Sequence, residues 1–168
     1  MARAKTAPFY ITDNQIGLST AAESVTIDVG AYVDPADSQG IEIISVDYIW
    51  DDTSNLPISN GGTDFRATAQ LKDSTNGDLV SPTSIHLVSS AHLSYSDVAV
   101  TSTDTDVFPD RLGIGKEGRI VVNDQLEFVT KSSANVASGR CTVRIMARVV
   151  TLTKKDYMTL ALQTVADN

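Results

Sequence analysis

The sequence has few of the residues that build metal and redox sites. It contains one cysteine, Cys141, and two histidines, His86 and His92. One cysteine excludes an intrachain disulfide, and no cysteine or histidine pair has the spacing of a zinc site. No apolar run approaches the roughly 18 residues of a membrane-spanning helix. Met1 to Asn14 lack the apolar segment of a secretory signal, so we expect folding in a reducing cytoplasm.

Basic residues are also scarce. Lys and Arg total 13 against 21 Asp and Glu, which gives a formal net charge of −8. Non-specific binding to nucleic acid requires Lys and Arg to neutralise phosphates, so the overall charge argues against a direct nucleic-acid partner. Of the acidic residues, 17 are Asp and 4 are Glu. Because Asp favours turns and disfavours helix interiors, this bias is typical of a protein built from sheets and loops.

Segments in which apolar and polar residues alternate follow one another from Ala22 to Leu152. The clearest of them places five apolar side chains on one face: Cys141, Val143, Ile145, Ala147 and Val149. Eight or nine such segments, with no helices between them, predict an all-β antiparallel sandwich, most simply an eight-stranded jelly roll.

Three segments have less simple patterns. From Ile41 to Trp50 apolar residues occupy both phases of the alternation, which predicts a central strand or one that meets a partner on its outer face. The segments 120–122 and 126–130 flank Asn123-Asp124 and predict a hairpin. Residues 101–118 are rich in Asp, Gly and Pro and predict a loop.

The two termini differ from the body of the chain. Residues 1–17 predict an N-terminal arm, whose Phe9 and Tyr10 could dock on its own body or on a neighbour's. The alternative is a frayed terminus with a short edge strand. Residues 18–168 predict one sandwich domain that includes a C-terminal helix over 154–166. Thr153 can cap this helix, and Asp156 stands at its third position.

The motifs that could carry chemistry are weak. Gly113, Gly115 and Gly118 match a nucleotide fingerprint but precede a strand rather than a helix, so we interpret them as loop glycines. Three carboxylates of the expected 101–118 loop are a weak calcium candidate, with a solvated acidic loop as the default: Asp104, Asp106 and Asp110. No G-x-S-x-G element supports a hydrolase. We therefore predict no catalytic residue and no cofactor.

Two further clusters have alternative interpretations. Arg140, Arg144 and Arg148 recur every four residues, which places them on one face of a strand. They could pair with Asp or Glu across the sheet, contact a neighbouring subunit, or bind a nucleic acid. Tyr48, Trp50 and the pair Asp51-Asp52 could form a sugar-binding platform or could pack at the end of a strand.

In length, strand number, short arm with Arg3 and Lys5, and lack of catalytic motifs, the chain resembles single jelly-roll capsid proteins of icosahedral viruses. The resemblance implies a non-enzymatic structural subunit that self-assembles in a virion made in the host cytoplasm. Its partners would be copies of itself and other capsid proteins. The expected interface residues are Phe9, Tyr10, Arg140, Arg144, Arg148, Tyr157, Leu160 and Val165. The alternative is a carbohydrate- or surface-binding β-sandwich module, and the alternative location is the cytoplasm.

Overall fold

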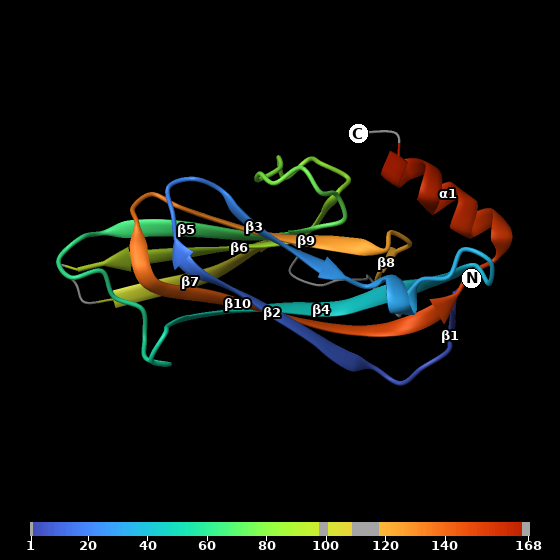
Figure 1. Cartoon of the computed structure of the whole chain (residues 1–168), viewed down its shortest axis with the longest axis horizontal. Coiled ribbons are helices and arrows are strands. Elements are labelled where there is room, and N and C mark those ends of the chain that lie inside the picture. Colours follow the sequence, from blue (N-terminus) through green and yellow to red (C-terminus); the bar gives the residue numbers. More distant parts are fainter. Residues whose placement is uncertain (1, 98–100, 109–117, 166–168) are drawn as a thin grey trace.

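The computed structural model describes residues 2–97, 101–108 and 118–165, with the backbone alone at 101–102, 105–108 and 164–165. Its elements are β1 (Arg3–Ala4), β2 (Phe9–Leu18), β3 (Glu23–Asp28), the 3-10 turn η1 (Gly30–Tyr32), β4 (Gln39–Asp52), β5 (Phe65–Lys72), β6 (Leu87–Ser96), β7 (Thr101–Phe108), β8 (Arg119–Val121), β9 (Gln125–Ser132), β10 (Val136–Thr151) and α1 (Lys154–Val165). Figure 1 shows two sheets that lie face to face, with α1 and the N-terminal end together at one end of the molecule.

All strand pairings are antiparallel. Sheet A has the order β1-β10-β4-β8, and β2 also pairs with β10; sheet B has the order β3-β9-β5-β6-β7. When β1 and β7 are left out, the remaining eight strands, numbered along the chain, have the orders 1-8-3-6 and 2-7-4-5. This is the jelly-roll arrangement of two sheets. The predicted all-β sandwich with a short C-terminal helix is therefore confirmed, and β1 and β7 are additions to it.

Two sequence-based predictions about connections were wrong. The expected loop at 101–118 contains β7, which pairs with β6. Its Ser, Thr and Asp residues lack an apolar alternation because β7 is an edge strand. The expected hairpin around Asn123-Asp124 is a crossing between sheets, since β8 pairs with β4 while β9 pairs with β3 and β5. The Asn123 side chain holds this corner by donating a hydrogen bond to the Asp73 carbonyl oxygen (2.9 Å).

A β-bulge explains the unusual pattern of β4. The pairing with β10 shifts between Met146 and Ala147, which lie opposite Ser45 and Ile43, so Ile44 is the extra residue. A one-residue bulge moves every later side chain to the other phase. Ile41 and Ile43 before it and Val46 and Tyr48 after it are therefore all buried in the same core. As predicted, β4 is a central strand, between β10 and β8, but its apolar pattern comes mainly from the bulge and not from two apolar faces.

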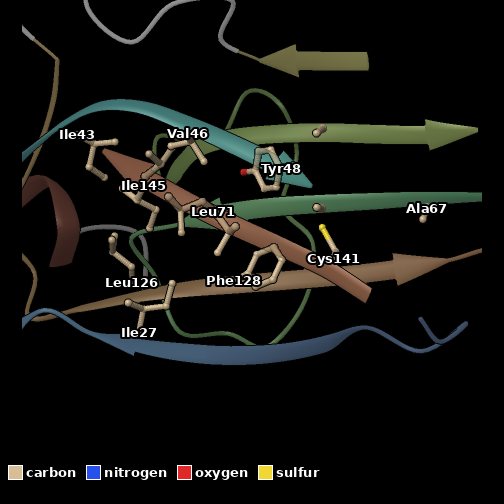
Figure 2. Packing of buried hydrophobic residues seen from close by; sticks show 14 of the residues in the cluster. Ile27, Ile43, Val46, Tyr48, Ala67, Leu71, Leu126, Phe128, Cys141 and Ile145 are labelled. Carbon is tan, nitrogen blue, oxygen red and sulfur yellow. The ribbon is translucent and has the colours of Figure 1, made fainter. Parts of the chain in front are cut away.

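The core lies between the two sheets (Figure 2). Alternate residues of β10 point into it, as the sequence predicted, and Cys141 is fully buried. Phe128 of β9 packs beside Tyr48 of β4, with ring centroids 6.3 Å apart. Alanines such as Ala67 and Ala147 fill the narrower positions. Burial raises the pKa of the Cys141 thiol well above its ordinary value, so this cysteine is an inert core residue.

The helix α1 closes one end of the sandwich. Thr153 caps it as predicted, because its Oγ1 accepts a hydrogen bond from the Asp156 amide (3.2 Å). The helix agrees with the predicted range through Val165; residue 166 lies outside the described part. A second apolar cluster holds α1 against β8 and the end of β10: Val122, Val150, Leu152 and Tyr157, with Ala2, Ile120, Leu160 and Ala161 beside it. Within the described residues, no helix is long and apolar enough to cross a membrane.

The segment predicted as an arm lies along its own sheet. Within 1–17, β1 pairs with the last residues of β10, and β2 covers the same edge of β10 over most of its length. In β2 the residues alternate between half-buried and exposed from Phe9 to Ile16. This alternation gives β2 an inner side toward the core and an outer side that continues the outer face of β10.

Candidate functional site

The outer face of sheet A is the surface that carries most of the predicted interface residues. Residues opposite each other on neighbouring strands share a face. From β2 through β10 to β4, the outward rows are Ile16–Arg140–Asp51, Asn14–Thr142–Ile49, Thr12–Arg144–Asp47 and Tyr10–Met146–Ser45; beyond the bulge Arg148 lies opposite Glu42. The three arginines thus lie on one face, as their spacing predicted.

Two of the arginines are bound within the chain. Arg140 makes a bidentate ion pair with Asp51, with Nε–Oδ1 and Nη2–Oδ2 distances of 2.8 and 2.6 Å, and it also donates to Asn55. Arg148 donates from Nε to Glu42 at 2.5 Å. The hydrogen bonds that Arg140 donates to Asp51 raise the pKa of Arg140, and the hydrogen bond that Arg148 donates to Glu42 raises the pKa of Arg148. Cross-strand pairing therefore accounts for Arg140 and Arg148.

Glu42 is the most protected group of this face. Burial alone would raise its carboxyl pKa, but hydrogen bonds from Arg148 and from the Gly118 amide (2.6 Å) outweigh burial, and the pKa is lowered. Gly118 lies against the backbone of β4: a Cβ atom there would stand 2.0 Å from the Ile43 carbonyl oxygen. A glycine is thus required by close packing on a strand, which is a different role from phosphate binding.

Arg144 differs from the other two arginines. It is exposed, and among the described residues no carboxylate lies within ion-pair distance of its guanidinium. Instead the guanidinium stacks on the Tyr10 ring, 3.9 Å from its centroid. Tyr10 itself is 54 % exposed. Arg and Tyr are enriched among the residues that dominate binding energy in protein interfaces, so this pair is the strongest contact candidate on the face.

Two exposed apolar side chains lie on the same face as this pair. Ile16 and Ile49, which are 55 % and 46 % exposed, stand in the two rows on the Arg140 side of it. The six charged residues of the outward rows balance: Arg140, Arg144 and Arg148 against Glu42, Asp47 and Asp51. A face without net charge in a chain of net charge −8 is a place where copies of the chain could approach with little repulsion.

The remaining predicted interface residues have contacts within the chain. Phe9 packs against Tyr32 of η1, with ring centroids 4.8 Å apart. Tyr157 is buried in the cluster that holds α1 against the sandwich, and Leu160 is partly buried beside it. Val165 is the last residue of α1, and its side chain lies outside the described part. The sequence pattern could not separate residues that hold α1 from residues that face outward.

The predicted sugar platform does not form an open aromatic face. Tyr48 is buried in the core, and Trp50 is half-buried against it. Asp51 is engaged by Arg140, while Asp52 Oδ1 accepts hydrogen bonds from the amides of Ser54 and Leu56. The alternative interpretation, packing at the end of a strand, therefore accounts for Tyr48 and Trp50, while Asp51 and Asp52 are held by Arg140 and by the following turn.

Within the described residues, neither the weak calcium motif nor the nucleotide motif forms a site. Asp104 and Asp106 lie on β7, and Asp110 lies outside the described residues, as do Gly113 and Gly115. Among the residues that the structure describes, no group of three His, Cys, Asp or Glu side chains could hold a metal. The exposed His92 of β6 contacts Thr68 Oγ1 through Nδ1 (2.9 Å), whereas His86 precedes β6 and is buried.

The outer face of sheet B carries an ion pair that sequence reasoning missed. The alternation of β5 places Lys72 outward, yet it is fully buried, with Nζ 2.8 Å from Glu127 Oε2. The connection between β5 and β6, residues 73–86, folds back over it. Lys72 also donates to the Asn76 side chain and to the Asp78 carbonyl, and Glu127 accepts from the Gly77 amide. Gln70 fixes the same connection through both backbone groups of Val80.

Comparison with known proteins adds little to this geometry. No family model matches the chain, and no curated protein matches it. Among solved structures, a chain from Desmodium yellow mottle tymovirus aligns with a TM-score of 0.38 and 10 % identity, over 89 % of this chain and 91 % of that chain. The function must therefore be inferred from the topology and surfaces of the chain itself.

Proposed function

We propose that the chain is a non-enzymatic structural subunit that self-assembles, most simply as a shell subunit of a virion. The observation that carries this proposal is the exposed Tyr10–Arg144 pair, which shares a face without net charge with the exposed Ile16 and Ile49. Arg140 and Arg148 flank the pair and are already neutralised, so a partner would not have to compensate them. The assignment to a virion is an analogy from the jelly-roll arrangement, since fold alone does not determine function.

The size of the face suggests how assembly would proceed. At about 3.3 Å per residue and about 4.8 Å between strands, its three strands present roughly 30 Å by 15 Å. A stable pairwise interface buries about 800 Å² per partner, so one contact through this face alone would be weak. Closed symmetry would sum many such contacts. We therefore expect assembly to begin above a threshold concentration.

Light scattering across protein and salt concentration, with negative-stain images of the same samples, tests the proposal. Salt screens the repulsion between chains of charge −8, whereas contacts between faces without net charge are weakened little. Association should therefore increase as salt rises from low to moderate. Closed shells, rings or sheets are the expected products. A monomer at every concentration and salt level would contradict self-assembly by this chain.

A matched pair of variants tests whether association occurs through the outer face of sheet A. Arg144→Ala removes an exposed arginine from the outer face of sheet A, and Arg66→Ala removes one from the outer face of sheet B. Both change the net charge by the same amount. We expect the Arg144 variant to raise the threshold concentration at least several-fold and the Arg66 variant to leave it within twofold. Equal effects of the two variants would show that net charge, rather than this face, controls association.

A further inference from the structure

A cavity of about 240 Å³ lies where β8, the residues before β6 and α1 meet. Five apolar and four polar residues line it: Ile85, Ile120, Val121, Val122 and Leu160, with Asp73, His86, Arg119 and Gln163. None of the residues that line the cavity belongs to the outward rows of β2, β10 and β4, so a ligand here would not occupy the proposed contact residues.

A buried carboxylate, that of Asp73, connects two of the polar residues of the cavity, His86 and Arg119. Asp73 is buried, and its Oδ1 lies 2.9 Å from His86 Nδ1 while its Oδ2 accepts from Arg119 Nη2 at 3.2 Å. Arg119 Nη2 also donates to the Ile85 carbonyl oxygen at 2.6 Å. A carboxylate accepts hydrogen bonds, so His86 carries a proton on Nδ1. In the neutral ring Nε2 is then bare, and protonation of the ring makes it a donor.

Two polar atoms of this group lack a hydrogen bond. His86 Nε2 and Arg119 Nε are both buried and have no partner in the described part of the chain. The His86 side chain is 93 % buried, given its 7 % exposure. A buried polar group without a partner costs about 1–3 kcal/mol, so a water molecule or a ligand with hydrogen-bonding groups would stabilise these two atoms.

The charges indicate what kind of ligand that is. Among the residues that line the cavity, Asp73, His86 and Arg119 are the charged or titratable ones; α1 contributes Leu160 and Gln163 and no charge. Asp73 balances Arg119, so protonated His86 leaves one positive charge. Arg119 Nε and His86 Nε2 then offer two donors to an anion, and charge-assisted hydrogen bonds of this kind are the strong ones.

We propose that this cavity binds an oxyanion group, carried on a compact and partly apolar molecule, through Arg119 and protonated His86. The apolar wall takes the body of the ligand, and Asp73 fixes the orientation of both donors.

The two histidines of the chain allow a test without any substitution. The imidazole signals are followed by NMR at constant pH while sulfate replaces chloride at equal ionic strength. We expect increasing sulfate to shift the His86 signal until the shift saturates and to leave the His92 signal unmoved. His92→Gln assigns the signals. A His86 signal that is identical in sulfate and in chloride would overturn the proposal.

Two controls sharpen this experiment. Arg119→Gln removes the fixed donor, and we expect the sulfate effect on His86 to fall at least fivefold while the signal of His92 is unchanged. Butanoate compared with acetate tests the apolar wall: butanoate should bind at least threefold more tightly. A sulfate effect that persists in the Arg119 variant would show that sulfate acts elsewhere and would also overturn the proposal.

Discussion

The two outer faces of the sandwich use the same kind of ion pair in opposite environments. On sheet B, Lys72 and Glu127 are sealed under residues 73–86, with 0 % and 5 % of their side chains exposed. On sheet A, Arg140 and Asp51 remain about one-fifth exposed. A sealed pair fixes the conformation of a connection, whereas an open pair keeps a surface neutral and available. The role of a charged residue on a strand face therefore depends on whether another segment covers it.

The largest effect is expected where the sealed pair is broken. Lys72→Met leaves Glu127 buried without compensation, and breaking a buried pair in this way costs about 3–5 kcal/mol of unfolding free energy. Urea denaturation measures the loss. The double variant Lys72→Met with Glu127→Gln keeps an acceptor for the Gly77 amide and should recover most of the stability. If the single variant unfolds like the wild type, the pair has no structural role.

An intermediate effect is expected at Glu42, which is buried while its partner Arg148 is partly exposed. Glu42→Gln weakens two hydrogen bonds to a charged group, for a loss of about 1.5–3 kcal/mol at neutral pH. The folded-state pKa of Glu42 is lowered from 4.5, so its contribution is present above pH 4.5 and is lost as the pH falls through the lowered pKa. Urea midpoints of the wild type and the variant should therefore converge toward low pH; a constant difference would contradict this assignment.

The smallest effect on stability is expected for the open pair. Arg140→Ala removes an ion pair that water and salt already screen, so the urea midpoint should move less than in either variant above. The shift should shrink further at high salt. A loss as large as that of Lys72→Met would show that burial does not distinguish the ion pairs of the two faces.

Much of the fold follows from local sequence patterns. The alternation of β10 gave the buried face that contains Cys141 and Val143, because a strand with one apolar face has one way to pack. Thr153 gave the start of α1 through a local cap. The bulge at Ile44 could not be predicted, since one extra residue and a strand buried on both faces leave the same pattern.

The sites could be predicted only in part, because they depend on contacts between residues that are distant in the sequence. Lys72 alternates with inward residues of β5 in the same way as Arg66 does, and only the long connection that folds over it makes it buried. The group of Asp73, His86 and Arg119 joins the two ends of the β5–β6 connection to the start of β8. The arginine face was predicted because it needs one strand alone, while its pairing with Tyr10 depends on the register of β2.

Hydroxyl-radical footprinting of monomeric and associated samples tests most directly whether copies meet through the outer face of sheet A. Tyr10 and Met146 report on that face, His92 on the outer face of sheet B, and Met158 on the exposed side of α1. We expect association to protect Tyr10 and Met146 from oxidation and to leave His92 and Met158 unchanged. Protection of His92 or Met158 without protection of Tyr10 would contradict the assignment of the interface.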